Sequence, residues 1–161
     1  SSLAEKFTDI DFLVVSAGVG FDYLKKLPPK KNLILKPLQP MNKFSYVLGT
    51  ADICLAVLEE DAGSFSVPSK VLSYFCAGKP ILMHGPAKNL SSKLIIDNEC
   101  GLVSSGNNFD KLESNLIKIR NKGNIDKMAR NSRNYAINNF QIEEVTKIFL
   151  GIIDTVLKKP K

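Results

Sequence analysis

Five short apolar runs recur along the first two thirds of this chain, and segments with helical spacing separate them. The runs are Asp11–Ser16, Asn32–Lys36, Asp52–Leu58, Ile81–Met83 and Gly101–Val103. Short runs that are apolar throughout are typical of parallel strands covered on both faces. Strands that alternate with helices at this spacing predict an α/β fold with a Rossmann-like, doubly wound parallel sheet and right-handed crossovers. After Ser105 the pattern is helical to the end, which predicts C-terminal helices.

The amount of apolar sequence limits how many domains the chain can form. Of its 161 residues, 44% are apolar, which is enough for one core and too few for two comfortable domains. We therefore expect a single domain over residues 1–161. No apolar run reaches the length of a membrane-spanning helix and no signal peptide is visible, so we expect a cytoplasmic protein. The chain begins without Met, which favours a piece of a larger protein.

The cysteines and lysines indicate which kinds of ligand and partner the chain can bind. Cys54, Cys76 and Cys100 are widely spaced and lack zinc-ligand spacing, so we expect buried, reduced thiols and no metal. The formal charge is +6, but the lysines are dispersed and no aromatic residues are interleaved with them, which argues against nucleic acid. Two interpretations of the charge stay open: dispersed surface lysine, and basic patches that meet an anionic membrane surface or phosphorylated substrates.

The segment Ser66–Leu82 combines a loop, a short helix, a glycine stop and a buried strand. Gly78 supplies the left-handed end of the helix. The start of the helix brings together two hydroxyls, a helix-starting proline and a cation: Ser66, Pro68, Ser69 and Lys70. Unpaired amides and the positive end of the helix suit a phosphate or diphosphate there, and an anion would offset the unfavourable placement of a lysine. The alternative is an ordinary capped helix on a sheet.

Two runs in this segment resemble the signature of retaining glycosyltransferases with the GT-B fold, the group 1 enzymes of bacterial surface-polysaccharide assembly. The runs are Val67–Tyr74 and Ala77–Leu82, and a more general resemblance extends from about Asp11 to about Phe149. The resemblance implies the C-terminal, Rossmann-like domain of such an enzyme, in which this helix receives the nucleotide-sugar donor. It implies that the donor diphosphate and sugar are contacted by Ser66, Pro68, Ser69 and Lys70.

The turn after the first predicted strand carries a further candidate, Gly18. In the family this turn faces the donor cleft, so the resemblance adds Gly18 to the donor contacts. By itself the pair Gly18 and Gly20 is a weak phosphate-loop signal, because the third glycine of a dinucleotide fingerprint is absent. The family domain also has a strand before the one at Asp11. This sequence starts after that point, so we expect the preceding strand and an acceptor domain to belong to a larger enzyme.

An acidic loop follows the third predicted strand and contains Glu59, Glu60 and Asp61. Ligands collect at the carboxyl ends of strands in doubly wound sheets, so these carboxylates are candidates for ribose or sugar hydroxyls. A solvated acidic loop is the alternative. The family holds the ribose with a glutamate where this sequence has Ser73, and its earlier glutamate is replaced by Phe65. Ribose recognition is therefore less well supported than diphosphate binding.

The single histidine, His84, follows the fourth predicted strand and is again at a carboxyl end. It is a candidate sugar contact, but it has no visible titratable companion for acid–base chemistry. No Ser-His-Asp arrangement, metal cluster or P-loop is apparent in the sequence. We therefore assign no catalytic residue, no metal and no cofactor.

These observations predict the donor-binding half of a glycosyltransferase. The whole enzyme would move a sugar from a nucleotide diphosphate-sugar, preferably a UDP-sugar, to a saccharide or lipid-linked acceptor at the inner face of the membrane. Without its N-terminal acceptor domain the chain is expected to be inactive. Two alternatives stay open: a flavodoxin-like or receiver-like signalling module, and a fragment of a GT-B-type sugar-nucleotide epimerase. The signalling module would need acidic residues where the first and third strands end, but these strands end at Ser16 and Leu58. The epimerase would need catalytic carboxylates and histidines, which this sequence lacks.

Overall fold

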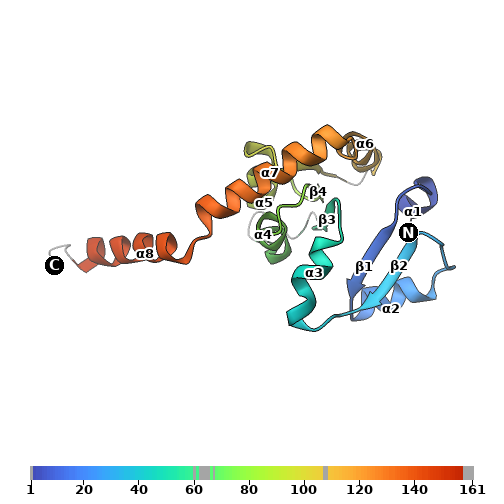
Figure 1. The fold of residues 1–161 in the computed structure, drawn as a ribbon, viewed down its shortest axis with the longest axis horizontal. Coiled ribbons are helices and arrows are strands. Elements are labelled where there is room, and N and C mark those ends of the chain that lie inside the picture. Colours follow the sequence, from blue (N-terminus) through green and yellow to red (C-terminus); the bar gives the residue numbers. More distant parts are fainter. Residues whose placement is uncertain (1, 60, 62–65, 67, 107–108, 158–161) are drawn as a thin grey trace. The chain divides into compact units, whose positions relative to one another are not determined.

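A computed structural model of the chain describes residues 2–59, 61, 66, 68–106 and 109–157. The chain divides into two compact units, residues 1–47 and 48–161. Figure 1 labels most of their helices and strands along the chain.

The first unit is built on two parallel strands. It contains α1 (Ser2–Lys6), β1 (Phe12–Ser16), α2 (Val19–Lys26), β2 (Leu33–Pro37) and the 3₁₀ helix η1 (Met41–Lys43), and α3 (Phe44–Gly49) leads into the second unit along the sequence. β1 and β2 pair in register from Phe12 opposite Leu33 onward. Asn32 Nδ2 donates to three backbone carbonyls of the preceding segment, those of Ala4 (3.0 Å), Phe7 (2.9 Å) and Ile10 (2.9 Å). One side chain thus ties α1 and the following turn to the start of β2.

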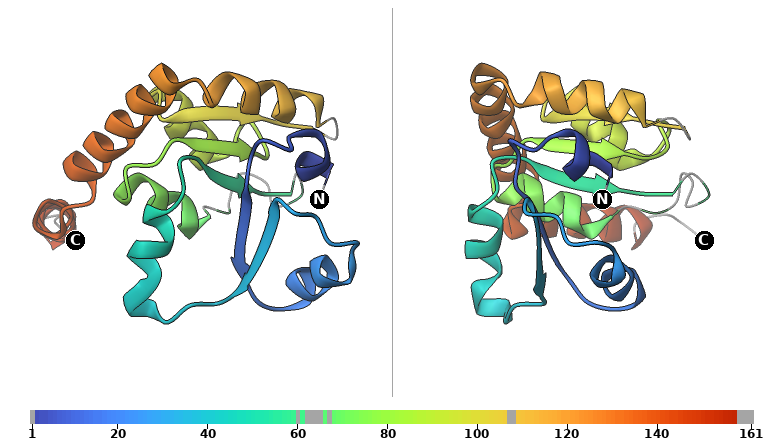
Figure 2. Two further views of the ribbon diagram at one scale, coloured as in Figure 1. Left: turned by 45° about the vertical axis from the view of Figure 1, so that its right-hand side comes forward. Right: turned by 90° about the vertical axis from the view of Figure 1, so that its right-hand side faces the viewer.

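The second unit contains three parallel strands. Its elements are β3 (Cys54–Val57), α4 (Ser69–Cys76), β4 (Ile81–His84), α5 (Leu90–Asp97), β5 (Gly101–Ser104), α6 (Asp110–Ile119), α7 (Lys122–Asn139) and α8 (Ile142–Leu157). The strand order is β3-β4-β5, and Figure 2 shows these strands running side by side. β4 lies between the other two and all four of its residues are buried, as expected for a central parallel strand.

The sequence prediction of an α/β fold with parallel strands is confirmed. All five predicted strands form close to their predicted bounds, and helices separate them. In the described residues the strands pair as two sheets, β1-β2 and β3-β4-β5. One continuous doubly wound sheet, the GT-B arrangement and the single domain therefore stay predictions.

The core of the second unit forms around α4. Val71 and Phe75 of this helix are fully buried, together with Ile81 and Met83 of β4. Val71 and Phe75 are one helical turn apart, so both side chains lie on one face of α4. The Phe75 ring also packs against Tyr135 of α7, with ring centroids 4.9 Å apart. α4 is therefore held from the strands on one side and from α7 on the other.

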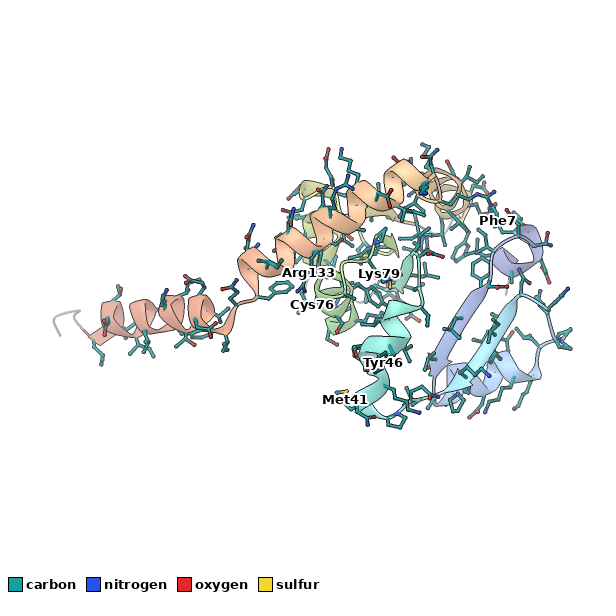
Figure 3. The ribbon with its side chains drawn as sticks, in the orientation of Figure 1. Phe7, Met41, Tyr46, Cys76, Lys79 and Arg133 are labelled. Atoms are coloured by element: carbon teal, nitrogen blue, oxygen red, sulfur yellow. The ribbon has the colours of Figure 1, made fainter. Side chains whose placement is uncertain are left out.

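Polar contacts anchor α7 to the turn that follows α4. Arg133 donates to the carbonyl of Cys76 (2.7 Å), and Ser132 Oγ donates to the carbonyl of Lys79 (2.9 Å). Figure 3 shows Arg133 beside Cys76 and Lys79. The prediction of three buried thiols is wrong at one position: Cys54 and Cys100 are buried, but Cys76, the last residue of α4, is exposed.

α8 differs from the other long helices because none of its described side chains is buried. Its exposed large apolar residues are Ile142, Ile148, Phe149, Leu150, Ile152, Ile153, Val156 and Leu157. Among the helices that the structure describes, none has both the length and the apolar character that a membrane span requires.

Candidate functional site

The carboxyl ends of β3, β4 and β5 meet at one edge of their sheet, because the three strands are parallel. His84 ends β4 and Ser104 ends β5 opposite it in register. α4 follows β3 and α5 follows β4, so both helices begin after this edge. In parallel α/β sheets, this is the edge where ligands bind.

Among the described residues, no side chain caps the first turn of α4. Pro68 precedes the helix with φ −64° and ψ 111°, an extended conformation that starts the helix without a capping bond. The Val71 amide bonds the Pro68 carbonyl at 2.9 Å, which leaves the amides of Ser69 and Lys70 without a partner among the described residues. The side chains of Ser69 and Lys70 are exposed. The arrangement thus presents donors and one positive charge to solvent.

The other end of α4 is fixed by Gly78. Its φ of 61° is left-handed, and the Lys79 amide reaches back to the Tyr74 carbonyl at 3.1 Å. This is the glycine-ended helix that the sequence predicts. Because Cβ at Gly78 would lie 3.2 Å from Cβ of Arg133, the glycine also lets α7 approach closely.

Asn89 joins the start of α5 to the segment before α4. It is fully buried. Its Oδ1 accepts from the Ser91 amide at 2.8 Å, which caps α5, and its Nδ2 donates to the Ser66 carbonyl at 2.6 Å. The capping role is visible in the sequence as an asparagine before an apolar helix. The bond to Ser66 is not, because it joins residues that only the fold brings together.

His84 is held in a defined orientation at the end of β4. Its Nδ1 lies 2.9 Å from Ser104 Oγ, and its ring stacks on Phe109 with centroids 4.8 Å apart. Ser104 Oγ also donates to the Met83 carbonyl at 3.3 Å, so these contacts join the ends of β4 and β5. Nε2 of His84 has no hydrogen-bond partner among the described residues.

The buried Cys54 of β3 and the half-buried Tyr74 of α4 carry titratable groups next to the site. Tyr74 donates from its hydroxyl to the Leu55 carbonyl at 3.2 Å. Burial raises the pKa of Tyr74 to about 12 and that of the Cys54 thiol to about 11. Both groups therefore stay protonated at neutral pH and contribute to the interior that supports α4.

The predicted donor contacts of the second unit fall into three groups. Ser66, Pro68, Ser69 and Lys70 lie together at the start of α4, all except Pro68 exposed. Glu59 and Asp61 are exposed on the loop after β3, and Glu60, like Phe65, lies outside the described residues. His84 is 7% exposed and is the last residue of β4, whereas the sequence predicts it just after that strand.

Gly18 belongs to the first unit. It precedes α2 with φ 89°, a conformation in which glycine is favoured. Its role in the donor site, which lies in the second unit, stays a prediction.

Two cavities occur in the second unit away from the start of α4. One, of about 400 Å³, is lined by the end of α5 and by α7; the other, of about 430 Å³, is lined by α5, β5, α6 and α7. None of the predicted site residues lines either cavity. Within the part of the chain that the structure describes, no three His, Cys, Asp or Glu side chains come together as metal ligands.

Comparisons of the chain with protein-family models, with curated proteins and with solved structures found no match. The functional assignment therefore depends on the sequence motif and on the geometry of the site.

Proposed function

We propose that this chain is the donor-binding half of a glycosyltransferase, and that the start of α4 binds the diphosphate of a nucleotide diphosphate-sugar. One observation carries the proposal: the exposed first turn of α4 presents the amides of Ser69 and Lys70, which no described residue caps, together with the Lys70 ammonium. This turn follows the carboxyl edge of the sheet. Amides, a helix dipole and a cation at one point match the charge and the acceptors of a diphosphate.

The reaction in this proposal transfers a sugar to a saccharide or lipid-linked acceptor at the inner face of the membrane. The bond between the anomeric carbon and the diphosphate oxygen breaks, and the diphosphate keeps the electron pair. An acceptor oxygen forms the new bond, and its proton passes to the departing diphosphate. Because negative charge grows on the diphosphate as its bond breaks, donors at the start of α4 stabilise the transition state more than the bound substrate.

Asn89 supports this role by positioning the segment before α4. Its hydrogen bond to the Ser66 carbonyl holds that segment against the start of α5. A donor site that is already ordered binds more tightly, because less conformational entropy is lost on binding. In this proposal Nε2 of His84 forms a hydrogen bond with a hydroxyl of the donor.

Titration of the chain with UDP by calorimetry tests the proposal. Lys70→Ala is expected to weaken UDP binding about tenfold, equivalent to about 1.4 kcal/mol, through loss of a charge-assisted contact. Lys93→Ala is the matched control, because Lys93 is an exposed lysine on α5. Equal affinity of the chain and the Lys70 variant, or covalent phosphorylation of the chain by acetyl phosphate as in a signalling module, would contradict the proposal.

A further inference from the structure

The cavity of about 400 Å³ at the end of α5 has an unusual lining. It is formed by residues 97–99 and by one side of α7, and five of its residues are asparagines: Asn98, Asn131, Asn134, Asn138 and Asn139. It is an open depression in the surface, so a ligand bound there would keep part of its own surface in contact with water. Carboxamides carry a donor and an acceptor side by side, so this surface offers many hydrogen bonds without adding charge.

The asparagines of α7 form a stripe that helix formation does not explain. Positions 131, 134 and 138 recur at helical spacing on one face. Asparagine is a poor residue for a helix interior, costing roughly half a kcal/mol relative to alanine at each position. Asn131 donates to the Glu99 carbonyl at 3.1 Å, a clear structural role. Asn134 and Asn138 are exposed and have no hydrogen-bond partner among the described residues.

The charges around the cavity select against anions. Asp97 and Glu99 contribute carboxylates to its lining, and the C-terminal end of α5 adds the negative end of a helix dipole. Lys127, which does not line this cavity, pairs with Glu99 at 2.8 Å and lowers the pKa of that carboxyl. Glu99 therefore stays ionised. A phosphate or nucleotide is disfavoured here, whereas a neutral ligand with many hydroxyls is not.

The lining of the cavity is held in place from behind. The Tyr135 ring packs against Phe75 (4.9 Å between centroids) and Phe140 (5.6 Å). Glu99 adopts a left-handed φ of 51°, a conformation that costs a residue with a side chain about 1 kcal/mol, and its carbonyl accepts from Asn131. The backbone that carries the carboxamides is therefore fixed before a ligand arrives, which favours specific binding.

We propose that this cavity is a second, independent binding site for a neutral saccharide. The free carboxamides of Asn134 and Asn138 accept from and donate to neighbouring sugar hydroxyls, and the carboxylate of Asp97 accepts from another. The site needs neither the diphosphate site at α4 nor a charged ligand. It would place a saccharide on the same unit that the proposed donor site occupies.

Side-chain amide signals in a ¹H–¹⁵N spectrum of the labelled full chain provide a direct test. Glucose, galactose, mannose and N-acetylglucosamine are each added to about 100 mM, a concentration suited to the millimolar affinity of a small neutral ligand. At least one sugar is expected to shift the carboxamide signals of Asn134 and Asn138. UDP at a concentration that shifts Lys70 is expected to leave them unchanged, so the two proposals succeed or fail separately.

Variants make the test specific. Asn134→Asp and Asn138→Asp keep the side-chain size but remove donors, and each is expected to weaken sugar binding at least fivefold. Arg130→Ala is the control, because Arg130 is exposed on α7 and lines neither cavity. The proposal is overturned if no sugar shifts the Asn134 and Asn138 signals, if the Asp variants bind as the unchanged chain does, or if phosphate or choline gives the same shifts.

Discussion

Asn89 Nδ2 donates a 2.6 Å hydrogen bond to the backbone carbonyl of Ser66, across 23 positions of sequence. The same side chain caps α5 through the Ser91 amide. A single buried amide thus sets both the start of α5 and the path of the chain just before α4. The proposed diphosphate site depends on this junction, because Ser66 and the first turn of α4 are close in sequence.

Replacing Asn89 is expected to destabilise the second unit and to weaken UDP binding. Asn89→Ala removes a helix cap and leaves the Ser66 carbonyl without this donor, for a loss of about 2 kcal/mol in the free energy of unfolding. Asn89→Asp keeps the capping acceptor and loses only the donor, so an intermediate loss is expected. Urea unfolding measures both. Equal stability of Asn89→Ala and the unchanged chain would show that the junction contributes nothing.

The parts of this fold that depend on local sequence were predictable. Pro68 before α4 and Gly78 after it marked the helix ends, since each residue restricts or permits particular backbone angles. Continuous apolar runs predicted the strands, because parallel strands covered on both faces are apolar throughout. The division of the strands into two sheets was not visible, because strand pairing joins segments that are distant in sequence.

The candidate site was predictable only in its motif. The residues at the start of α4 lie together because they are neighbours in the chain. The pairing of His84 with Ser104 and the bond from Ser132 to the Lys79 carbonyl join separate strands and helices, and neither has a local sequence signal. The asparagine-lined cavity was not predicted for a related reason. The asparagines of α7 recur at helical spacing in the sequence, but the cavity forms only where the end of α5 lies beside them in the fold.

Gly101 is expected to be the least replaceable glycine of the second unit. A Cβ at this position would lie 1.8 Å from the Ile81 carbonyl oxygen, a backbone atom of the neighbouring strand. Gly101→Ala therefore forces β4 and β5 apart and is expected to cost about 3 kcal/mol or more. Thermal unfolding followed by circular dichroism measures the loss. Gly151→Ala is the control, because its Cβ meets nothing within 4 Å, and an equal effect of the two variants would contradict this explanation.

Alkaline pH is expected to destabilise the second unit through Cys54 and Tyr74. Burial raises the pKa of Cys54 from 9.0 to about 11 and that of Tyr74 from 10.0 to about 12. Above pH 9 the unfolded chain releases these protons while the folded chain keeps them, so the free energy of unfolding falls as pH rises. The contribution of Cys54 is complete below pH 9 and is lost between pH 9 and about 11.

The slope of stability against pH separates Cys54 from the other groups. Cys54→Ala is expected to flatten the decline between pH 9 and 11 in urea unfolding, whatever its effect on stability at neutral pH. Cys76→Ala is the control, because that thiol is exposed at the end of α4, and its slope should match that of the unchanged chain. If the free energy of unfolding falls with the same slope in the unchanged chain, Cys54→Ala and Cys76→Ala, the pH dependence comes from other groups.

Removing α8 is expected to leave the stability of the second unit unchanged. No described side chain of this helix is buried, whereas Phe140, just before it, packs against Phe75 and Tyr135. A chain that ends at Gln141 keeps this aromatic cluster. Because burial of apolar surface supplies most of the folding free energy, the urea midpoint of this shortened chain should match that of the full chain.

Truncation before Phe140 is the matched comparison. It should lower the urea midpoint and reduce the free energy of unfolding by about 3 kcal/mol, as for loss of a packed phenylalanine. A comparable loss on removing α8 alone would show that its apolar residues contribute to the core, contrary to their exposure here.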